Sequence, residues 1–308
     1  MTPSMTMNSS PSRKILREIV AFFYYYTGFH YFLMKSYDKR KATILVYHDP
    51  SPEVLRAHLE YLSGTFTFIP LGTLVKAIKN KYWSAIPPNS LVLTFDDGHK
   101  GNHALLDLFK TYRVQPTLSL CSHIVNTNRH FWWNNGSLDV RELKRMTCEE
   151  MFLHLRGQTG FEPEREYPDR QALSLQELRA MSPFVEFGSH TRFHPVLTNC
   201  SDERCFHEVA DSKTFLEELL QKPIEHFAYP NGDYREREAR FVKTCGYHSG
   251  RTLDIGRNGI DADPCRLKAI AIEDDASINI LRAQISGFFC YLKYSRHRSF
   301  RGARPPLL

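Results

Sequence analysis

Two adjacent carboxylates follow an apolar run in the segment LVLTFDDGHKG, residues 91–101. Asp96 and Asp97 come directly after residues typical of a buried strand, where like-charge repulsion and loss of solvent both disfavour ionised carboxylates. A bound cation between the two groups would remove that cost. The pair therefore predicts a cation site, and the alternative is a turn in which an Asp caps the next helix.

A second group with metal-binding chemistry lies in SHTRFHP, residues 189–195. His190 and His194 are four residues apart, a spacing that places two imidazoles on one side of a helical turn. One carboxylate and two imidazoles make three ligands for a borderline divalent ion and leave a coordination position for water. The second Asp would then act as general base on that water. Thr191 stands where HExxH zinc proteases have Glu, so that motif is absent.

From residue 42 the chain alternates short apolar runs with helical patterns, which predicts βα units around a parallel sheet, open or closed into a barrel, in one domain. In such folds functional groups collect past the carboxyl ends of strands, where Asp96 and Asp97 lie. A longer polar region, 122–184, lacks strand alternation and is expected to cross the sheet as an insertion. The expected strands are 42–48, 66–70, 91–95, 117–121 and 185–188, and the expected helices are 51–63, 71–80 and 101–113.

The net charge of +6 is concentrated at the two ends of the chain. Residues 1–41 carry seven Lys or Arg against two acids, and residues 291–308 carry five and no acid, so the body between them is mildly acidic. This distribution argues against a nucleic-acid-binding face and indicates contact with an anionic surface. Solvated, disordered ends are the alternative.

The segment 19–34 contains no charged residue and is rich in aromatics, but it is shorter than the ~20 residues that span a bilayer. We expect a helix in the headgroup region, giving residues 13–41 a peripheral membrane contact. An uncleaved signal-anchor and a helix packed on the domain are the alternatives. Seven cysteines without CxxC spacing favour a reducing compartment, so we expect a cytoplasmic protein at the inner membrane. The sequence leaves the oligomeric state open.

The order of these motifs resembles the polysaccharide deacetylase family, also called the NodB-homology domain or carbohydrate esterase family 4. The resemblance covers about residues 42–272, and the opening 46–70 is similar to that of bacterial members. It implies an α/β fold, a distorted (β/α)7 barrel with the insertion at 122–184, in a catalytic domain over 42–290 between the segments 1–41 and 291–308. The matching motifs are TFDDG (94–98), GSHTRFHP (188–195), FAYPNGDY (227–234) and GYHSGRT (246–252).

The resemblance also implies an activity. The chain is expected to be a hydrolase acting on carbon–nitrogen bonds other than peptide bonds, which removes N-acetyl groups from an acetylated glycan or a lipid-linked sugar. By match of position, the metal ligands would be Asp97, His190 and His194, and Asp96 would be the general base for attack of metal-bound water. Zn²⁺ is the expected ion, although Co²⁺, Mn²⁺ and Ni²⁺ also suit these ligands. A catalytically impaired glycan- or lipid-linked-sugar-binding protein on the same fold is the alternative.

The segment FAYPNG resembles the motif that supplies an oxyanion-binding N–H in this family. By that match, the backbone N–H of Asn231 would hold the oxyanion. Tyr229 and Pro230 are expected to contact substrate. Trp132, in the aromatic cluster 131–133, is expected either to stack on a sugar ring or to pack in the core.

Two departures from the family pattern concern proton transfer. An arginine usually orients the catalytic Asp, but its two usual positions hold Ala228 and Ala269. Arg251, Arg266 and Lys268 are the remaining candidates for that function.

The late Leu-x-His motif that supplies the general acid in many members is also missing. His48, at the end of the first strand, and His248 are the candidate proton donors. His99 and His103 follow Asp97 closely and are expected to face solvent or substrate.

Overall fold

The computed structural model describes residues 11–28, 31, 38–134 and 138–289. The predicted basic tail at 291–308 and parts of the predicted N-terminal segment lie outside the described residues.

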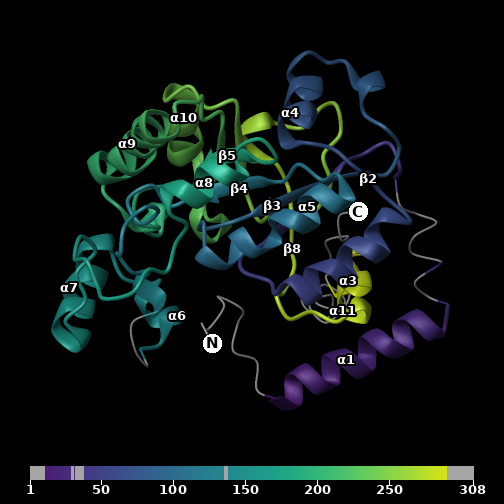
Figure 1. Cartoon of the computed structure of the whole chain (residues 1–308), viewed down its shortest axis with the longest axis horizontal. Coiled ribbons are helices and arrows are strands. Elements are labelled where there is room, and N and C mark those ends of the chain that lie inside the picture. The colour runs from purple at the N-terminus through teal and green to yellow at the C-terminus, as the bar shows by residue number, and fades with distance from the viewer. Residues whose placement is uncertain (1–10, 29–30, 32–37, 135–137, 290–308) are drawn as a thin grey trace, which may run out of the picture.

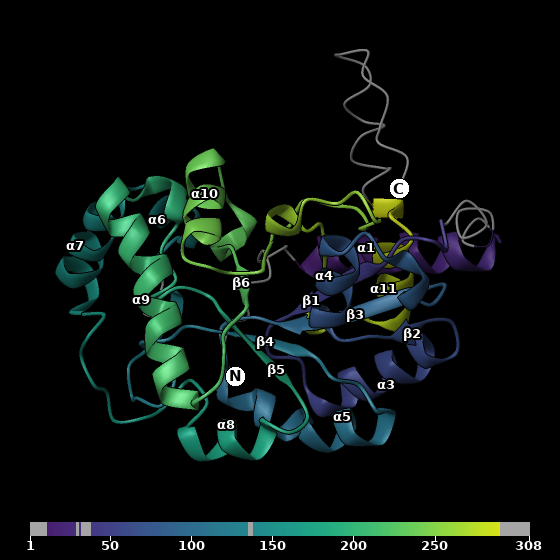
Figure 2. The ribbon, with the colours of Figure 1, turned by 90° about the horizontal axis from the view of Figure 1, so that it is seen from above.

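The described chain forms one sheet of parallel strands with helices around it, shown in Figures 1 and 2. The strand order is β7-β6-β5-β4-β3-β1-β8, and β2 pairs with β3 outside that path. Every pairing is parallel, as the alternation of strand and helix patterns predicts. The strands are β1 (Thr43–Tyr47), β2 (Thr67–Phe68), β3 (Ser90–Phe95), β4 (Thr117–Leu120), β5 (Glu186–Ser189), β6 (His226–Ala228), β7 (Ser249–Arg251) and β8 (Ile270–Ala271).

One segment joins the two edges of this sheet. Leu267 forms a parallel bridge with Arg251 of β7, and its N–H donates to the carbonyl of Gly250 at 2.9 Å. Three residues later, Ile270 and Ala271 pair with β1. The sheet therefore curls into a distorted barrel that closes through residues 267–271, which confirms the predicted fold class.

Helices cover the outside of the barrel, and Figure 2 shows α3, α5 and α8 together along one side. The α-helices are α1 (Pro11–Tyr26), α3 (Pro52–Ser63), α4 (Leu71–Lys79), α5 (Leu106–Tyr112), α6 (Val140–Leu143), α7 (Cys148–Thr159), α8 (Leu175–Met181), α9 (Asp202–Leu220), α10 (Glu236–Thr244) and α11 (Ile278–Ile285). Short 3-10 turns are η1 (Trp83–Ala85), η2 (Lys100–Leu105), η3 (Trp132–Asn134), η4 (Leu197–Asn199), η5 (Pro230–Gly232) and η6 (Pro264–Arg266).

Local sequence explains where α3 begins and which face it buries. The side chain of Ser51 caps the helix by accepting the N–H of Val54, and Pro52 occupies the first turn, where its missing N–H costs nothing. Its buried residues recur with the spacing of one helical face. They are Leu55, His58, Leu59 and Leu62.

A buried polar contact fixes α3 on the first strand. The Nε2–H of His58 donates to the carbonyl of Ala276 at 2.9 Å, which leaves Nδ1 to accept the hydroxyl of Tyr47 at 3.1 Å. Burial lowers the pKa of His58, so the neutral ring needed for both bonds is favoured. The end of β1, where His48 follows, is thereby held at a defined position.

The insertion between β4 and β5 contains η3, α6, α7 and α8, and no strand occurs in its described residues, as predicted. It nevertheless contributes to the main core through Phe131, Trp132 and Phe161. The side-chain amide of Asn199 donates to the carbonyls of Lys144 and Met146, each at 2.9 Å. These contacts hold the insertion against the barrel beside the strand ends.

Helix α1 packs along α11 at the margin of the molecule (Figure 1). Within the described residues, no helix has both the length and the apolar character needed to traverse a bilayer. The helix predicted at 19–34 is matched only in part, because α1 covers Pro11–Tyr26 and residues 29–30 and 32–34 lie outside the described part of the chain. The buried face of α1 packs on the domain, which is one of the alternatives.

Candidate active site

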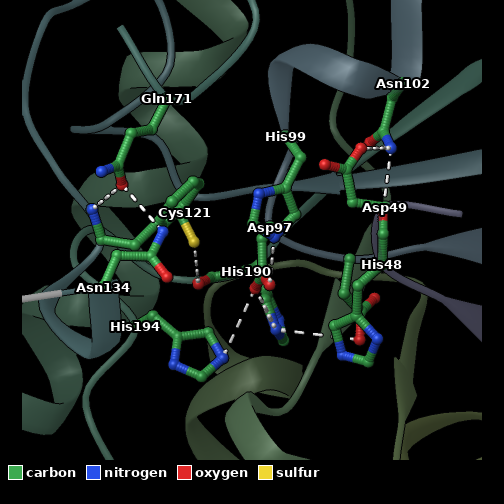
Figure 3. A network of polar contacts seen from close by, with 12 residues as sticks. His48, Asp49, Asp97, His99, Asn102, Cys121, Asn134, Gln171, His190 and His194 are labelled. Carbon is green, nitrogen blue, oxygen red and sulfur yellow. Dashed lines mark hydrogen bonds and ion pairs between the residues drawn. The ribbon is translucent and has the colours of Figure 1, made fainter. Parts of the chain in front are cut away.

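The strand ends gather the predicted site residues at one edge of the barrel. Asp97 follows β3, His190 follows β5, and Arg251 ends β7. Figure 3 shows the side chains of His190, His194 and His99 around Asp97. Asp97 and the two histidines at 190 and 194 are buried, and their nearest ligand atoms all lie within 4.8 Å of one another.

The two distances from Asp97 Oδ1 to the imidazole nitrogens suit a tetrahedral metal site. Asp97 Oδ1 lies 3.5 Å from His190 Nε2 and 3.6 Å from His194 Nε2. Ligands about 2.0–2.2 Å from a zinc ion in tetrahedral geometry are about 3.3–3.6 Å apart. Within the described residues Asp97 Oδ1 is buried without any hydrogen-bond partner, a costly state for a carboxylate oxygen unless a cation lies there.

Neighbouring groups orient both imidazoles. His190 donates its Nδ1–H to the carbonyl of Ala228 at 2.8 Å, which leaves the Nε2 lone pair directed at Asp97. The ring of His194 packs edge-on against Trp133, with centroids 4.5 Å apart. Burial lowers the pKa of His194 well below its ordinary value, so the neutral, ligand-competent ring is favoured.

His99 holds the second oxygen of Asp97. Its Nε2 lies 3.1 Å from Asp97 Oδ2, which leaves only Oδ1 to face the histidine pair. Burial opposes ionisation of Asp97, but the hydrogen bond from His99 and the attraction of His194 outweigh it and keep the pKa of the carboxyl far below its usual range. His99 is itself buried and packs on the ring of Phe131. The prediction that His99 faces solvent or substrate is therefore wrong, because its ring is buried and positions Asp97.

Arg251 supplies the orienting cation that the sequence left open. Its Nη2 bonds both oxygens of Asp96, and the two side chains are almost fully buried. The other two candidates lie elsewhere, because Arg266 pairs with Glu236 and Lys268 is exposed. Asp96 Oδ2 is also 3.8 Å from His190 Nε2, so the pair lies directly beside the predicted metal site.

Four non-glycine residues at the site adopt left-handed backbone angles, which cost about 1–2 kcal/mol each. They are Asp97 (φ 71°), Thr191 (φ 68°), His194 (φ 58°) and Asn231 (φ 57°). For a β-branched threonine this conformation is rare, and local bonds maintain it. The Thr191 hydroxyl accepts the His194 N–H at 3.0 Å. The backbone is thus bent so that His194 turns back toward Asp97.

A buried carboxylate on α9 supports the same loop. Glu208 Oε2 accepts the backbone N–H groups of Arg192 and Phe193 at 2.9 and 3.2 Å, and its Oε1 pairs with Arg204 at 3.1 Å. Burial raises the pKa of Glu208 above its ordinary value, although these partners oppose the shift. No motif in the sequence signals this support, since Glu208 lies on a different element.

The FAYPNG segment forms the turn η5 after β6, next to the strand that carries His190. The N–H groups of Gly232 and Asp233 close the turn by bonding Tyr229 and Pro230 carbonyls at 2.8 and 3.1 Å. The N–H of Asn231 is not used in closing it. This geometry is compatible with the predicted oxyanion donor.

The three side chains predicted to contact substrate are all buried. Trp132 is 1% exposed and donates its indole N–H to the carbonyl of His194 at 2.9 Å, so it supports a ligand loop rather than a sugar. Tyr229 is fully buried and its hydroxyl donates to the carbonyl of Cys265. Pro230, also buried, shapes the turn. Of the two expectations for Trp132, stacking on a sugar ring or packing in the core, the structure agrees with packing in the core.

The two candidate proton donors lie at opposite ends of the barrel. His248 precedes β7 and pairs with Glu225 on the surface at 3.3 Å, so the structure does not bring it to the site. His48 follows β1 and lies on the same side as Asp97, as Figure 3 shows. The backbone N–H groups of His48 and Asp49 both donate to Asp274, each at 3.0 Å. His103 lies in η2, partly exposed.

One cation near the site has no sequence signal. Lys144, at the end of α6 in the insertion, interacts electrostatically with Asp97, His194 and Asp233. Burial lowers its pKa, and the two carboxylates oppose that shift. The insertion therefore brings a positive charge to the edge of the site.

Comparison with known proteins agrees with this geometry. A family model described as polysaccharide deacetylase matches residues 84–250, just over half of the chain. The curated protein "Putative polysaccharide deacetylase YxkH" of Bacillus subtilis (strain 168) is 20% identical over 263 residues, covering 82% of this chain and 78% of that protein.

Solved structures share the fold at low sequence identity. The Streptococcus pyogenes deacetylase PplD, solved in complex with acetate, superposes with a TM-score of 0.58 at 20% identity, over 79% of this chain and 98% of that one. IcaB from Ammonifex degensii gives a TM-score of 0.59 at 15% identity, over 80% of this chain and 96% of that one. At these identities the likeness establishes the barrel architecture.

Proposed function

Because the chain belongs to the polysaccharide deacetylase family, and so is a carbohydrate deacetylase and a hydrolase, we propose that it removes N-acetyl groups with a divalent metal held by Asp97, His190 and His194. Zn²⁺ is the ion that suits this donor set, and Co²⁺, Mn²⁺ and Ni²⁺ are its competitors. The substrate class is an acetylated glycan or a lipid-linked sugar.

The observation that carries this proposal is the buried Asp97 Oδ1, which lacks a hydrogen-bond partner in the described residues and faces two imidazole nitrogens at 3.5 and 3.6 Å. A cation bound there would polarise the acetyl carbonyl and lower the pKa of an attacking water. Asp97 and His190 follow strand ends, and His194 lies in a loop held by local hydrogen bonds, which favours a preorganised site.

Within this proposal, Asp96 accepts the proton of the attacking water. Arg251 bonds both Asp96 oxygens, which fixes their direction. The backbone N–H of Asn231 then stabilises the negative charge that develops on the acetyl oxygen. These groups lie on β3, β7 and the turn after β6, so the barrel itself sets their separation.

His48 is the proposed donor of the proton to the leaving amine. It is only partly buried, it follows β1 on the side of the barrel that carries Asp97, and it is among the groups that lower the pKa of Asp97. The backbone N–H groups of His48 and Asp49 donate to the Asp274 carboxylate, which fixes this segment. We also propose that the protein is cytoplasmic, an idea supported by the free thiols of its six described cysteines.

Acetate release from N-acetylated oligosaccharides tests the function. We expect release that stops with a chelator, returns with Zn²⁺, and falls by roughly 10³-fold or more in Asp96→Asn, since that variant keeps the shape of the side chain but loses the base. Binding of oligosaccharides without acetate release under any of the four metals would instead identify a glycan-binding protein.

A further inference from the structure

Helix α1 exposes a continuous apolar stripe. Half of the large apolar side chains exposed in the described residues lie on this one helix. At 3.6 residues per turn they cover about a third of the helix circumference and extend over roughly 18 Å of this 16-residue helix. This α1 stripe consists of Ile15 (61% exposed), Leu16 (58%), Ile19 (48%), Phe22 (45%), Phe23 (59%) and Tyr26 (65%).

The opposite face of α1 is fixed to the domain. Ala21 and Tyr24 are buried, and the Tyr24 ring stacks on Phe288 with centroids 4.0 Å apart. The guanidinium of Arg282 lies 3.8 Å from the centroid of Tyr25. Figure 1 shows α1 at the margin of the molecule with the body on one side only. The stripe is therefore held in a set orientation, facing away from the barrel.

We propose that the α1 stripe docks on the surface of an anionic lipid bilayer. The helix is too short to cross a membrane, but an apolar face with aromatic residues suits the boundary between headgroups and acyl chains. The flanking sequence is strongly cationic: residues 291–308 carry five Lys or Arg and no acid. That segment starts beside Phe289, whose ring centroid lies 4.8 Å from the guanidinium of Arg17 on α1.

Charge also argues against a second copy of the chain as the occupant. Residues 1–41 and 291–308 each have an excess of five positive charges, and pairing two stripes would bring four such segments together. An anionic surface is instead attracted to both segments. The apolar area and the charge therefore favour the same partner.

Ion pairs connect α1 to the segment that holds His48. Lys14 of α1 pairs with Asp275 at 2.7 Å and Arg17 pairs with Glu273, while Asp274 between them holds the backbone of His48 at the end of β1. Residues 273–275 thus contact both the helix that would bind the bilayer and the backbone of the proposed proton donor. Resting on the proposed function, this geometry selects an acetylated sugar carried on a lipid as the substrate class.

Vesicle sedimentation of the full chain tests the docking. We expect binding to phosphatidylcholine vesicles that contain phosphatidylglycerol, weaker binding as salt is raised, and little binding to phosphatidylcholine alone. Ile19→Glu combined with Phe23→Glu should weaken binding by roughly tenfold or more. Leu153→Glu, at a 70% exposed position on α7, is the matched control and should bind as the wild type does. Circular dichroism confirms that each variant is folded.

Three results would overturn the docking proposal: no binding to either vesicle, equal binding by the stripe variant, or a wild-type dimer that the stripe variant converts to monomer in light scattering. The substrate class is tested separately, with the same acetylated sugar free in solution and carried on a lipid in vesicles. The stripe variant should lose acetate release only from the vesicles, and equal rates for both proteins there would contradict the lipid-linked assignment. Vesicle binding without acetate release from either substrate would refute the proposed function alone.

Discussion

Arg251 at the end of β7 bonds both carboxylate oxygens of Asp96, which follows β3, although three strands separate β7 and β3 in the sheet. The two side chains meet across the barrel, and both are nearly inaccessible to solvent. The pair gives the proposed base a fixed direction and compensates its buried charge.

Arg251→Met should separate these two effects. An uncompensated buried Asp96 is expected to lower the free energy of unfolding by about 3–5 kcal/mol, measured by denaturant titration with chelator present. The rate of acetate release should fall roughly 10²-fold or more, because the base is no longer oriented.

Adding Asp96→Asn to Arg251→Met should recover most of the stability and none of the activity. If the double variant is as unstable as Arg251→Met, the loss came from packing of the arginine stem rather than from the charge pair.

Asp97→Asn should abolish tight metal binding. The amide is a weaker ligand than the carboxylate, so we expect zinc retained after dialysis to fall from about one ion per chain to nearly none. Asp233→Asn removes a carboxylate from a more exposed neighbouring position and should retain zinc. Equal zinc content in the two variants would show that Asp97 is not a ligand.

Trp132→Phe should weaken the histidine loop without touching a ligand atom. The carbonyl of His194 loses its 2.9 Å bond from the indole, at a cost of about 1–3 kcal/mol in the free energy of unfolding. Zinc affinity should also fall, by roughly 10-fold. Trp83→Phe, in the distant turn η1, is the control. Zinc titration compares the two variants, and equal affinities would contradict the support of the His194 loop by Trp132.

His226 should make the fold sensitive to mild acid. Burial, together with smaller contributions from His248 and Lys213, lowers its pKa to about 4. As pH falls below about 6.5, the unfolded chain binds the proton first, so stability decreases until pH reaches about 4. The group accounts for at most about 3 kcal/mol over this window.

The measurement for His226 is the slope of unfolding free energy against pH. His226→Gln should show a shallower slope than the wild type between pH 6.5 and 4, whatever its stability at neutral pH. Parallel slopes would mean that other histidines, such as His58, carry the acid sensitivity.

The sequence predicts the barrel and the clustering of Asp97, His190 and His194 well because both depend on local patterns. Strand ends carry Asp97 and His190, and parallel strands bring their ends to one edge. Arg251 could be named only as one of three candidates, since its contact with Asp96 depends on how far the sheet curls. Aromatic spacing likewise does not distinguish a sugar platform from core packing, and Trp132 proved to be core.

The closing segment 267–271 lies outside the residues that the family model matches. The residues matched by the family model, 84–250, omit β1, which pairs with β3, and also β8 and Arg251. A fragment trimmed to that match would expose unpaired strand edges and bury Asp96 without its counter-charge. Domain transplantation should therefore keep β1, β8 and Arg251 with the matched residues, together with α1, which packs on α11.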